Sequence, residues 1–290
     1  MSACVLAHNQ FNQFKMDTIW LPPALVCYAL SAAGFVAGRT ANRQRWTDQA
    51  VPLLGAAVLF HTLDLLVGAL NAGNIPVTNF AQSLSFLAWL TAIVSFILIS
   101  RMRMQVLGAF VAPGVLAAAG AAMLLRSSGR LTIPDSLRSA WLPVHVTLAF
   151  LGDALFVVAA GVSLAYLVHE SRLKAKRPMA PAGQTMPSLE KLDRINYRLL
   201  GWGFVMLSLA IVSGALWADA TWGHFWSWEP QESWSLITWL LYAALLESRI
   251  AAGWRGRRAA ALTLAVFTVL LGSFLSVSLL FPGKHGGSFG

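Results

Sequence analysis

Charged residues are scarce in this chain of 290 residues. Only 11% of them are Asp, Glu, Lys or Arg, whereas an average soluble domain carries about 25%. The hydrophobic share is 57%, and the mean hydropathy is +0.63. This balance excludes a soluble globular protein, a disordered chain and a coiled coil.

Cysteine is almost absent as well. Cys4 lies in a polar N-terminal stretch and Cys27 in an apolar one, and the chain has no C-x-x-C or C-x-x-C-H motif. These gaps exclude a disulfide-stapled scaffold, a thiol oxidoreductase and a c-type cytochrome. The sequence also lacks a phosphate-binding glycine loop and a nucleophile elbow, so no motif predicts a catalytic residue.

The sequence does contain a series of apolar stretches, each near the length of about 20 residues that an α-helix needs to cross the hydrocarbon of a membrane. Runs between charges, Pro and Gly predict eight spans, near residues 19–38, 51–70, 80–100, 105–125, 142–168, 199–218, 234–251 and 259–281. The predicted fold class is therefore an all-α, polytopic membrane helix bundle.

The polar residues 1–18 lack the basic, then apolar, then small-residue order of a signal peptide, so we expect the first apolar segment to stay in the membrane. We predict an external tail over 1–18, a transmembrane domain over 19–281 and an external tail over 282–290.

The formal net charge is +9, and the Lys and Arg residues are distributed unevenly between alternate loops. If the N-terminus is outside, sixteen of the 21 fall on the cytoplasmic side. The positive-inside rule then predicts that both termini lie outside a cell inner (plasma) membrane, with residues 169–198 as a Pro-rich cytoplasmic connector. Orientation explains the basic balance, so nucleic-acid binding is not predicted.

The outer segment between Trp217 and Trp239 is rich in tryptophan. An aromatic belt at the membrane interface explains one or two Trp at a helix end. It explains less well the four Trp at positions 222, 226, 228 and 234, which lie within thirteen residues. Such a cluster also suits a flat, largely apolar ligand stacked at the outer surface. The residues alone leave both interpretations open.

The acidic residues of this segment have a structural explanation. In Glu229-Pro230-Gln231-Glu232, Pro stands at the first helical position and Glu232 stands three residues after the cap position. This order is typical of a helix start with a capping box. We expect it to begin the seventh helix.

Two histidines flank the same outer face, His145 at the outer end of the fifth predicted span and His285 just beyond the eighth. Together they could ligate one haem iron from opposite sides, although each alone also fits an interfacial histidine. Basic residues on the outer side could hold two haem propionates or contact phospholipid head groups: Arg126, Arg130, Arg138 and Lys284.

His61 lies near the middle of the second predicted span, with Asp64 one turn further on the same face. Because ionisable groups at that depth are costly, three roles stay open: an intramembrane haem ligand, a proton relay with Asp64, or a hydrogen bond between helices. Asp153 and Glu247 are further acids within predicted spans. Surface or interfacial positions are expected for the remaining histidines, His8, His169 and His224.

The stretch WGHFWSWEPQESWSLITWLLYA resembles the tryptophan-rich WWD signature of haem-handling membrane proteins, in the form found in the CcsA (ResC) family of cytochrome c assembly proteins. The resemblance covers most of the chain after residue 50 and includes PVTNFAQSLSFLAWL, WLPVHVTLAFLG, LDRINYRLLGWGF and GWRGRRAA. The chain departs from the family pattern at Glu229 (usually Asp), Gln231 (Lys), Ala81-Gln82 (Tyr-Glu), Glu247 (the His of L-H-x-R) and its C-terminal GKHGGSFG.

The resemblance implies a haem-binding, haem-presenting subunit of a cytochrome c synthase, with haem b as its substrate. In such proteins a ResB/CcsB-like membrane partner helps to deliver haem to the C-x-x-C-H of an exported apocytochrome c. The implied iron ligands are His145 and His285, with His61 as the candidate for a further site within the membrane. The signature implies that haem is contacted by Trp222, Gly223, Trp226, Trp228, Glu229, Glu232, Trp234 and Trp239. The expected chemistry is positioning, without an acid or a nucleophile from this chain.

Two other functions are compatible with the residues. One is a haem transporter or a membrane regulator of haem metabolism without ligation activity. The other is a proton-coupled transporter built around His61, Asp64, Asp153 and Glu247. A haem absorption spectrum would separate the haem functions from the proton-coupled one, and a co-purifying partner would single out the synthase.

Overall fold

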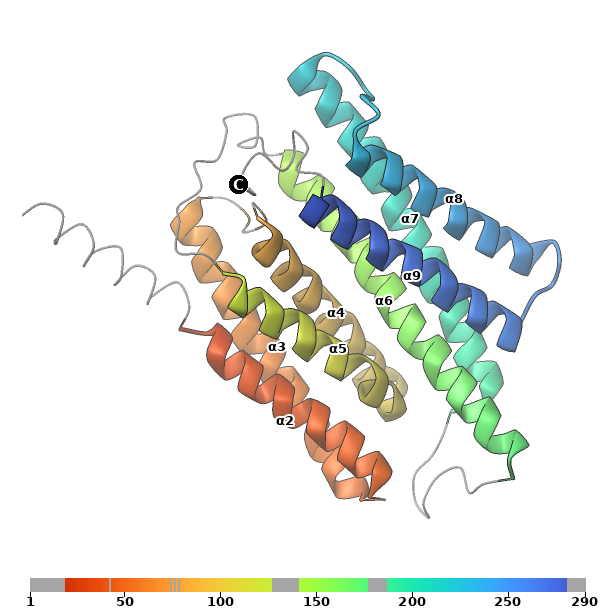
Figure 1. The fold of residues 1–290 in the computed structure, drawn as a ribbon. Coiled ribbons are helices and arrows are strands. Elements are labelled where there is room, and N and C mark those ends of the chain that lie inside the picture. Colours follow the sequence, from red (N-terminus) through yellow and green to blue (C-terminus); the bar gives the residue numbers. More distant parts are fainter. Residues whose placement is uncertain are drawn as a thin grey trace, which may run out of the picture.

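A computed structural model describes residues 19–41, 43–73, 75, 77, 79–126, 141–176 and 187–280. Within these ranges all regular structure is helical, which confirms the predicted all-α class (Figure 1). The helices are α2 (Leu21–Thr40), α3 (Gln44–Ala72), α4 (Phe80–Met102), α5 (Gln105–Leu124), α6 (Trp141–Lys174), α7 (Leu189–Trp222), α8 (Pro230–Ile250) and α9 (Arg257–Leu280).

Seven of these helices are long and apolar enough to cross a membrane, so the chain is a polytopic membrane helix bundle as predicted. The exception is α8. It coincides with the seventh predicted span and is 21 residues long, but it is not apolar enough to be counted as a membrane span. Its first two turns carry the polar sequence PQESWS, which lowers the mean hydropathy of the whole helix. The count of apolar spans in the described ranges is therefore seven where the sequence predicts eight.

The bundle consists of two groups of four helices (Figure 1). In the first half, α2 packs against α3 and α5, and α4 packs against α3 and α5. In the second half, α6 packs against α7 and α9, and α8 packs against the same two helices. Contacts of α6 with α4 and α5 join the halves. Helix α6 is thus the central element that connects the two groups.

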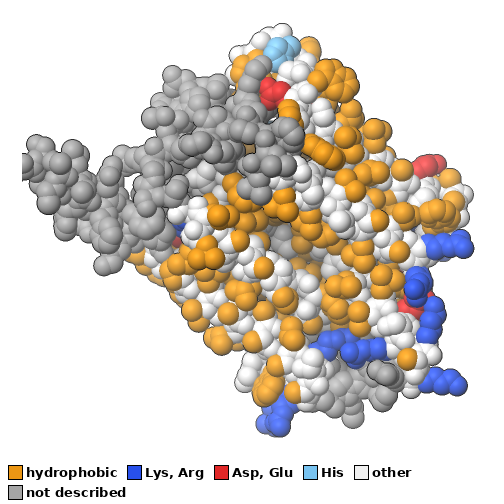
Figure 2. Space-filling model, viewed as in Figure 1, with side chains coloured by type: hydrophobic (Ala, Val, Ile, Leu, Met, Phe, Trp, Pro, Cys, Tyr) orange, Lys and Arg blue, Asp and Glu red, His pale blue; other side chains and the backbone are white. Residues whose placement is uncertain are grey.

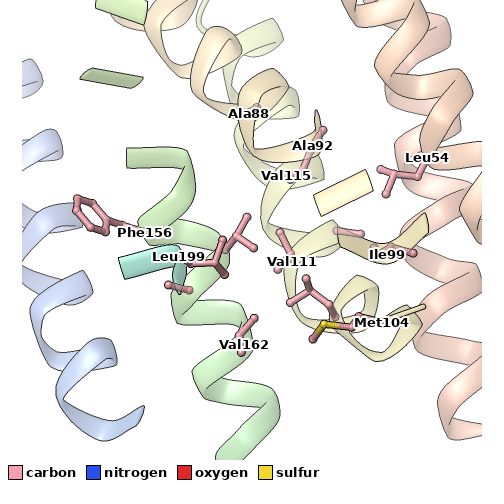
Figure 3. Close-up of a cluster of buried hydrophobic side chains, with 14 of the residues drawn as sticks. Leu54, Ala88, Ala92, Ile99, Met104, Val111, Val115, Phe156, Val162 and Leu199 are labelled. Carbon is pink, nitrogen blue, oxygen red and sulfur yellow. The ribbon is translucent and has the colours of Figure 1, made fainter. Parts of the chain in front are cut away.

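One continuous core runs through this junction. Figure 3 shows Leu54, Ile99 and Met104 from the first half in the same buried cluster as Phe156 and Leu199 from the second. Close approach of α5 and α6 requires Gly161, because a Cβ at that position would collide with the side chain of Val111. Small residues allow membrane helices to pack closely, since lipid supplies no hydrophobic force between them. The junction therefore holds the halves in one orientation.

We call one end of the bundle the basic end. The opposite end, where α7 finishes and α8 begins, is the tryptophan end. At the basic end, α2, α4, α6 and α8 finish and α3, α5, α7 and α9 begin. Apart from Arg126, the described Lys and Arg residues lie at or near this end. Figure 2, viewed as in Figure 1, shows blue Lys and Arg side chains along the edge of the molecule where α6 ends and α9 begins. The separation of charge between the ends agrees with the loop pattern in the sequence. The orientation of these ends relative to a cell membrane stays a prediction.

A polar network ties the second half together at the basic end. The guanidinium of Arg249, 8% exposed, donates to Asp193 Oδ2 at 2.8 Å. The second carboxylate oxygen of Asp193 accepts the backbone N–H of Gly256 at 3.0 Å, in the turn between α8 and α9. Asn196 Nδ2 donates to Ser163 Oγ on α6 at 2.8 Å. These contacts explain the LDRIN and GWRGRR segments structurally, because Asp193 fixes where α8 ends and α9 begins and Asn196 ties α7 to α6.

Candidate functional site

The most distinctive connection at the tryptophan end joins α7 to α8. Helix α7 ends at Gly223, whose φ of 78° is the left-handed conformation that favours glycine at a helix end. Glu232, in the first turn of α8, accepts from the backbone N–H groups of Ser227 at 2.8 Å and Glu229 at 3.3 Å. The predicted capping box is thus confirmed. Glu232 fixes the shape of the segment 223–229, which we call the tryptophan loop.

Aromatic rings pack against one another in the last turns of α7 and along the tryptophan loop. Trp217 and Trp222 meet edge to face at 4.9 Å between ring centroids, and the ring of His224 stacks on Trp222 at 6.3 Å. Trp226 and Trp228 form a second edge-to-face pair at 5.9 Å. Trp228 is 72% exposed and has a φ of 59°, a conformation that is costly for a bulky residue. The loop therefore holds an exposed indole in a strained position.

Two nitrogen atoms of the tryptophan loop are buried without a hydrogen bond. These are Nδ1 of His224 and Nε1 of Trp226. Buried polar groups are rarely left unpaired in folded proteins, and each such atom calls for an explanation. The loop thus offers two polar groups that a bound molecule could satisfy. His224, which the sequence places at the surface or interface by default, belongs to this loop through its stacking on Trp222.

His145 lies near the start of α6 and contacts α7. Its Nδ1 is 2.9 Å from the carbonyl oxygen of Ala210 and 3.4 Å from Ser213 Oγ. Because a backbone carbonyl only accepts hydrogen bonds, Nδ1 carries the proton and the lone pair of the imidazole lies on Nε2. One turn earlier in α6, Trp141 Nε1 donates to the carbonyl of Ser213 at 2.9 Å. Together these bonds hold the start of α6 against the helix that ends in the tryptophan loop.

The ring of His145 also fits closely against the backbone of α7. A Cβ placed on Gly214 would come within 2.6 Å of His145 Cε1 and 3.0 Å of its Nδ1. Ala210, Ser213 and Gly214 thus form the surface that orients this imidazole. Sequence reasoning missed these three residues. For Ser213 and Gly214 the available signal was the small-residue run SGA in the last third of α7, since small residues mark close contact between membrane helices.

The remaining predicted tryptophans lie on α8. Trp239 Nε1 donates to Ser208 Oγ on α7 at 2.8 Å, and its ring stacks on Phe204 at 5.2 Å. Trp234 is half-buried one turn into the helix. The structure therefore places Trp239 in the contact between α7 and α8, and the tryptophans at 222, 226 and 228 at the end of the bundle.

The predicted basic residues divide between described and undescribed parts of the chain. Arg126, at the end of α5, pairs with Asp64 of α3 at 3.3 Å, and Asp64 is almost fully buried. Both residues belong to the first half of the bundle. A cavity of about 10 Å³ lies beside this pair, lined by Leu21, Leu65, Ala81, Gln82, Ser85, Ala122 and Arg126. His285, Lys284, Arg130 and Arg138 lie outside the described residues.

His61 is completely buried among three helices. Its Nδ1 is 3.2 Å from the hydroxyl of Tyr28 on α2, and its Nε2 is 2.9 Å from Ser85 Oγ on α4. Of the three roles that the sequence leaves open, these contacts describe the hydrogen bond between helices. An iron ligand at this position would require one of the two bonds to break.

The structure does not gather the four residues of the proton-coupled alternative into one site. His61 and Asp64 lie on α3, which packs against α2, α4 and α5. Asp153 is half-buried on α6, and Glu247 is exposed near the basic end of α8.

Comparison with known proteins identifies the family. Residues 77–285 match the family model described as Cytochrome C assembly protein. The Cytochrome c biogenesis protein CcsA of Gloeothece citriformis is 32% identical, over 82% of this chain and 87% of its own length. CcsA of Synechocystis sp. is 31% identical over 77% of this chain and 84% of its own length. CcsA of Chlamydomonas reinhardtii is 32% identical over 82% of this chain and 67% of its own length.

A solved structure has a similar fold. It is the Cytochrome c Heme Lyase CcmF, with a TM-score of 0.63 and 18% identity over 94% of this chain. This chain spans 52% of the CcmF chain, about half its length. The likeness shows a shared helical arrangement. With the family range and the curated relatives, it leads to one conclusion: the chain belongs to the cytochrome c assembly protein family, as a multi-span membrane protein of the CcsA type.

Proposed function

We propose that this protein binds haem b at the tryptophan end and presents it as the haem-handling subunit of a cytochrome c synthase. The observation that carries the proposal is the hydrogen bond from His145 Nδ1 to the Ala210 carbonyl at 2.9 Å. Histidines that ligate metals usually donate their other ring N–H to a carbonyl or a carboxylate, which fixes the ring and its lone pair. In this proposal His145 is one axial ligand of the haem iron, and His285 is the other.

The tryptophan loop supports a flat, apolar substrate. Indole faces suit a porphyrin, and the unpaired nitrogens of His224 and Trp226 suit its polar edge. The strained, exposed Trp228 would be stabilised by contact with the ring system. Glu229 and Glu232 act on the haem indirectly, since Glu232 shapes the loop through its backbone hydrogen bonds. Gly223 supports the loop by ending α7.

The propionates of haem would meet the basic residues of the tryptophan end. Arg130, Arg138 and Lys284 are proposed for this role, together with Arg126. Arg126 reaches a propionate only if it shares or releases Asp64, to which it is bound at 3.3 Å. We therefore expect Arg126 to contribute less than the others.

The contribution of this chain to the synthase reaction is position. Thioether formation adds a cysteine thiol across each haem vinyl group, so a C–S bond forms and the thiol proton passes to the other vinyl carbon. Holding the two reactants in register removes much of the entropic barrier. His145 and the tryptophan loop would orient the haem, while an apocytochrome with C-x-x-C-H supplies the thiols. A ResB/CcsB-like membrane protein is the proposed partner.

The proposal is tested by purifying the full chain from a haem-replete host and recording its absorption spectrum. We expect b-type haem with a bis-histidine spectrum. Co-expression with a ResB/CcsB-like partner and an apocytochrome should then yield covalent cytochrome c. A preparation without haem overturns the proposal. Haem without covalent product, in the presence of the partner, favours a haem transporter or regulator instead.

The proposed orientation places the tryptophan end and both termini outside the inner (plasma) membrane. Alkaline phosphatase fused to the C-terminus should be active in a bacterial host, because that enzyme requires export. A fluorescent C-terminal green fluorescent protein fusion would contradict this orientation. It would mean that the predicted number of membrane crossings is wrong by one.

A further inference from the structure

The cavity beside the ion pair of Arg126 and Asp64 lies in the first half of the bundle, at the tryptophan end. Leu21, Gln82 and Arg126 are among its lining residues, so it lies where α2 and α4 begin and α5 ends. Its volume of about 10 Å³ is close to the smallest space that holds one water molecule. We call it the Arg126 cavity.

Ser85 connects the Arg126 cavity to the buried histidine of the first half. It lines the cavity, and its Oγ is 2.9 Å from Nε2 of His61. Within the described parts of the chain, this is the only hydrogen bond of the Ser85 hydroxyl. Ser95, further along the same helix, instead donates to the carbonyl oxygen of Thr91 at 2.7 Å, as serines inside helices often do. The hydroxyl of Ser85 is therefore directed to His61 and the cavity.

The hydrogen bond to His61 leaves Ser85 with capacity for a second partner. A neutral imidazole has one N–H and one lone pair, so one of the hydroxyls of Tyr28 and Ser85 donates to the ring and the other accepts from it. If Ser85 donates, its oxygen can still accept. If Ser85 accepts, its O–H still needs an acceptor. In either arrangement, a molecule in the Arg126 cavity can complete the hydrogen bonding of this buried group.

The guanidinium of Arg126 provides hydrogen-bond donors at the same cavity. Its Nη1 is 3.3 Å from Asp64 Oδ2, and this contact uses only one of the several N–H groups of a guanidinium. The side chain of Arg126 is 20% exposed, so it reaches from the end of the bundle to the cavity. Gln82 adds a side-chain amide to the lining. Buried water molecules typically make about three hydrogen bonds to polar groups of this kind.

An empty cavity is the alternative. Leu65 and Ala122 belong to the apolar part of the lining, and cavities lined only by apolar groups stay dry. The lining of the Arg126 cavity is mixed, because it also includes Ser85, Gln82 and a charged guanidinium. A dry cavity would leave the second hydrogen bond of Ser85 unmade, which is costly for a buried hydroxyl. The polar side chains therefore favour water.

We infer that the Arg126 cavity binds a water molecule that bridges Ser85 and Arg126. Through this water, a path of hydrogen bonds connects His61, in the middle of the first half, to the tryptophan end of the bundle. Water at this position also explains why a fully buried histidine is paired with a serine that faces a cavity. The site is independent of haem, so it can succeed or fail separately from the proposed function.

The test measures how fast silver ions reach a thiol in the cavity of the purified full chain, because Ag⁺ is a small ion that enters with water and binds thiolates. The chain carries Cys4→Ser and Cys27→Ser, so that one introduced thiol is measured at a time. Ser85→Cys places this thiol at the cavity. Ser95→Cys is the matched control, since Ser95 is buried in the same helix and does not line the cavity. Thiols that Ag⁺ has not blocked are counted with a maleimide dye after unfolding.

We expect Ag⁺ to block the thiol of Ser85→Cys at least about tenfold faster than that of Ser95→Cys, because a buried thiol without access to water reacts only when the structure opens locally. Ala122→Val, added to Ser85→Cys, fills the cavity and should slow the reaction to the rate of the control. Ala81→Cys lines the same cavity and repeats the test without altering the hydrogen bond to His61.

Equal rates at the cavity positions and at the control would mean that the cavity is dry or closed, and the water site would be wrong. A fast reaction that Ala122→Val leaves unchanged would place the route of water elsewhere and would also overturn the assignment.

Discussion

The two halves of the bundle each contain a histidine within their helices, and the protein surrounds them differently. His61 in the first half is completely buried, with the hydroxyls of Tyr28 and Ser85 at its two nitrogens. His145 in the second half is only partly buried, and its Nδ1 is fixed by the backbone of the helix that ends in the tryptophan loop. A histidine bonded through both nitrogens connects helices. The carbonyl contact holds the ring of His145 against α7 and places its lone pair on Nε2.

The family comparison treats the two halves differently in part. The matched range begins at residue 77, so it contains α4 to α9, including His145 and the tryptophan loop. Helices α2 and α3, with Tyr28, His61 and Asp64, lie outside it. The matched range thus contains the whole second half, with the proposed haem site, but only α4 and α5 of the first half.

The largest effect is expected for His145→Ala. Removing an axial ligand should lower the haem retained after purification by at least about 100-fold, since loss of an outer-sphere partner alone already costs 10–100-fold in metal affinity. Haem content is measured by the pyridine haemochrome assay. Added imidazole should restore part of it by filling the space of the lost ring. Full haem content in the variant would remove His145 from the site.

His61→Leu should lower stability and leave haem content unchanged. The substitution leaves the buried hydroxyls of Tyr28 and Ser85 without their partner, which costs about 2 kcal/mol. Unfolding in mixed detergent micelles, followed by tryptophan fluorescence, measures this loss. The triple variant Tyr28→Phe, His61→Leu, Ser85→Ala removes all three polar groups and should recover most of the stability. A folded His61→Leu protein without haem would move the haem site into the first half.

Gly214→Ala tests whether the position of the His145 ring matters. The new Cβ would lie 2.6 Å from His145 Cε1, so the ring must move. We expect haem retention to fall about tenfold, with an altered absorption spectrum, because small displacements of a metal ligand are costly. Gly201→Ala on the same helix is the control, since a Cβ there meets nothing within 4 Å. Equal effects in the two variants would show that only helix flexibility had changed.

Sequence reasoning predicted the helices better than their ends. Each predicted span coincides with a helix, yet α6 and α7 run to Lys174 and from Leu189, well beyond the apolar windows at 142–168 and 199–218. A hydropathy window detects only the part of a helix that suits lipid. The charged turns beyond it stay helical through pairs four residues apart, such as Glu170 with Lys174 and Glu190 with Arg194.

The candidate site was predictable in part for a related reason. Its reactive and aromatic residues, His145 and the tryptophans, can be recognised in the sequence, because they stand at ends of predicted spans that lie on the same side of the predicted bundle. The residues that orient His145 are an alanine carbonyl and a glycine on α7, more than 60 residues away in the sequence. A carbonyl has no sequence signature, and contact between two distant helices has no local pattern. The geometry that distinguishes His145 from His61 therefore emerged only in the structure.

The smallest effects are expected for a matched pair of tryptophans, one in each half. Trp89 Nε1 donates to Thr62 Oγ1 and Trp239 Nε1 donates to Ser208 Oγ, both at 2.8 Å. Trp→Phe at either position removes one hydrogen bond between membrane helices, which on average contributes about 0.6 kcal/mol. We expect the two variants to lose similar stability in the micelle assay, and both to keep their haem. Phe at position 239 retains the stacking on Phe204. If Trp239→Phe alone loses haem, the haem site extends along α8 into the bundle. Trp239 would then contact haem as well as hold α8 against α7.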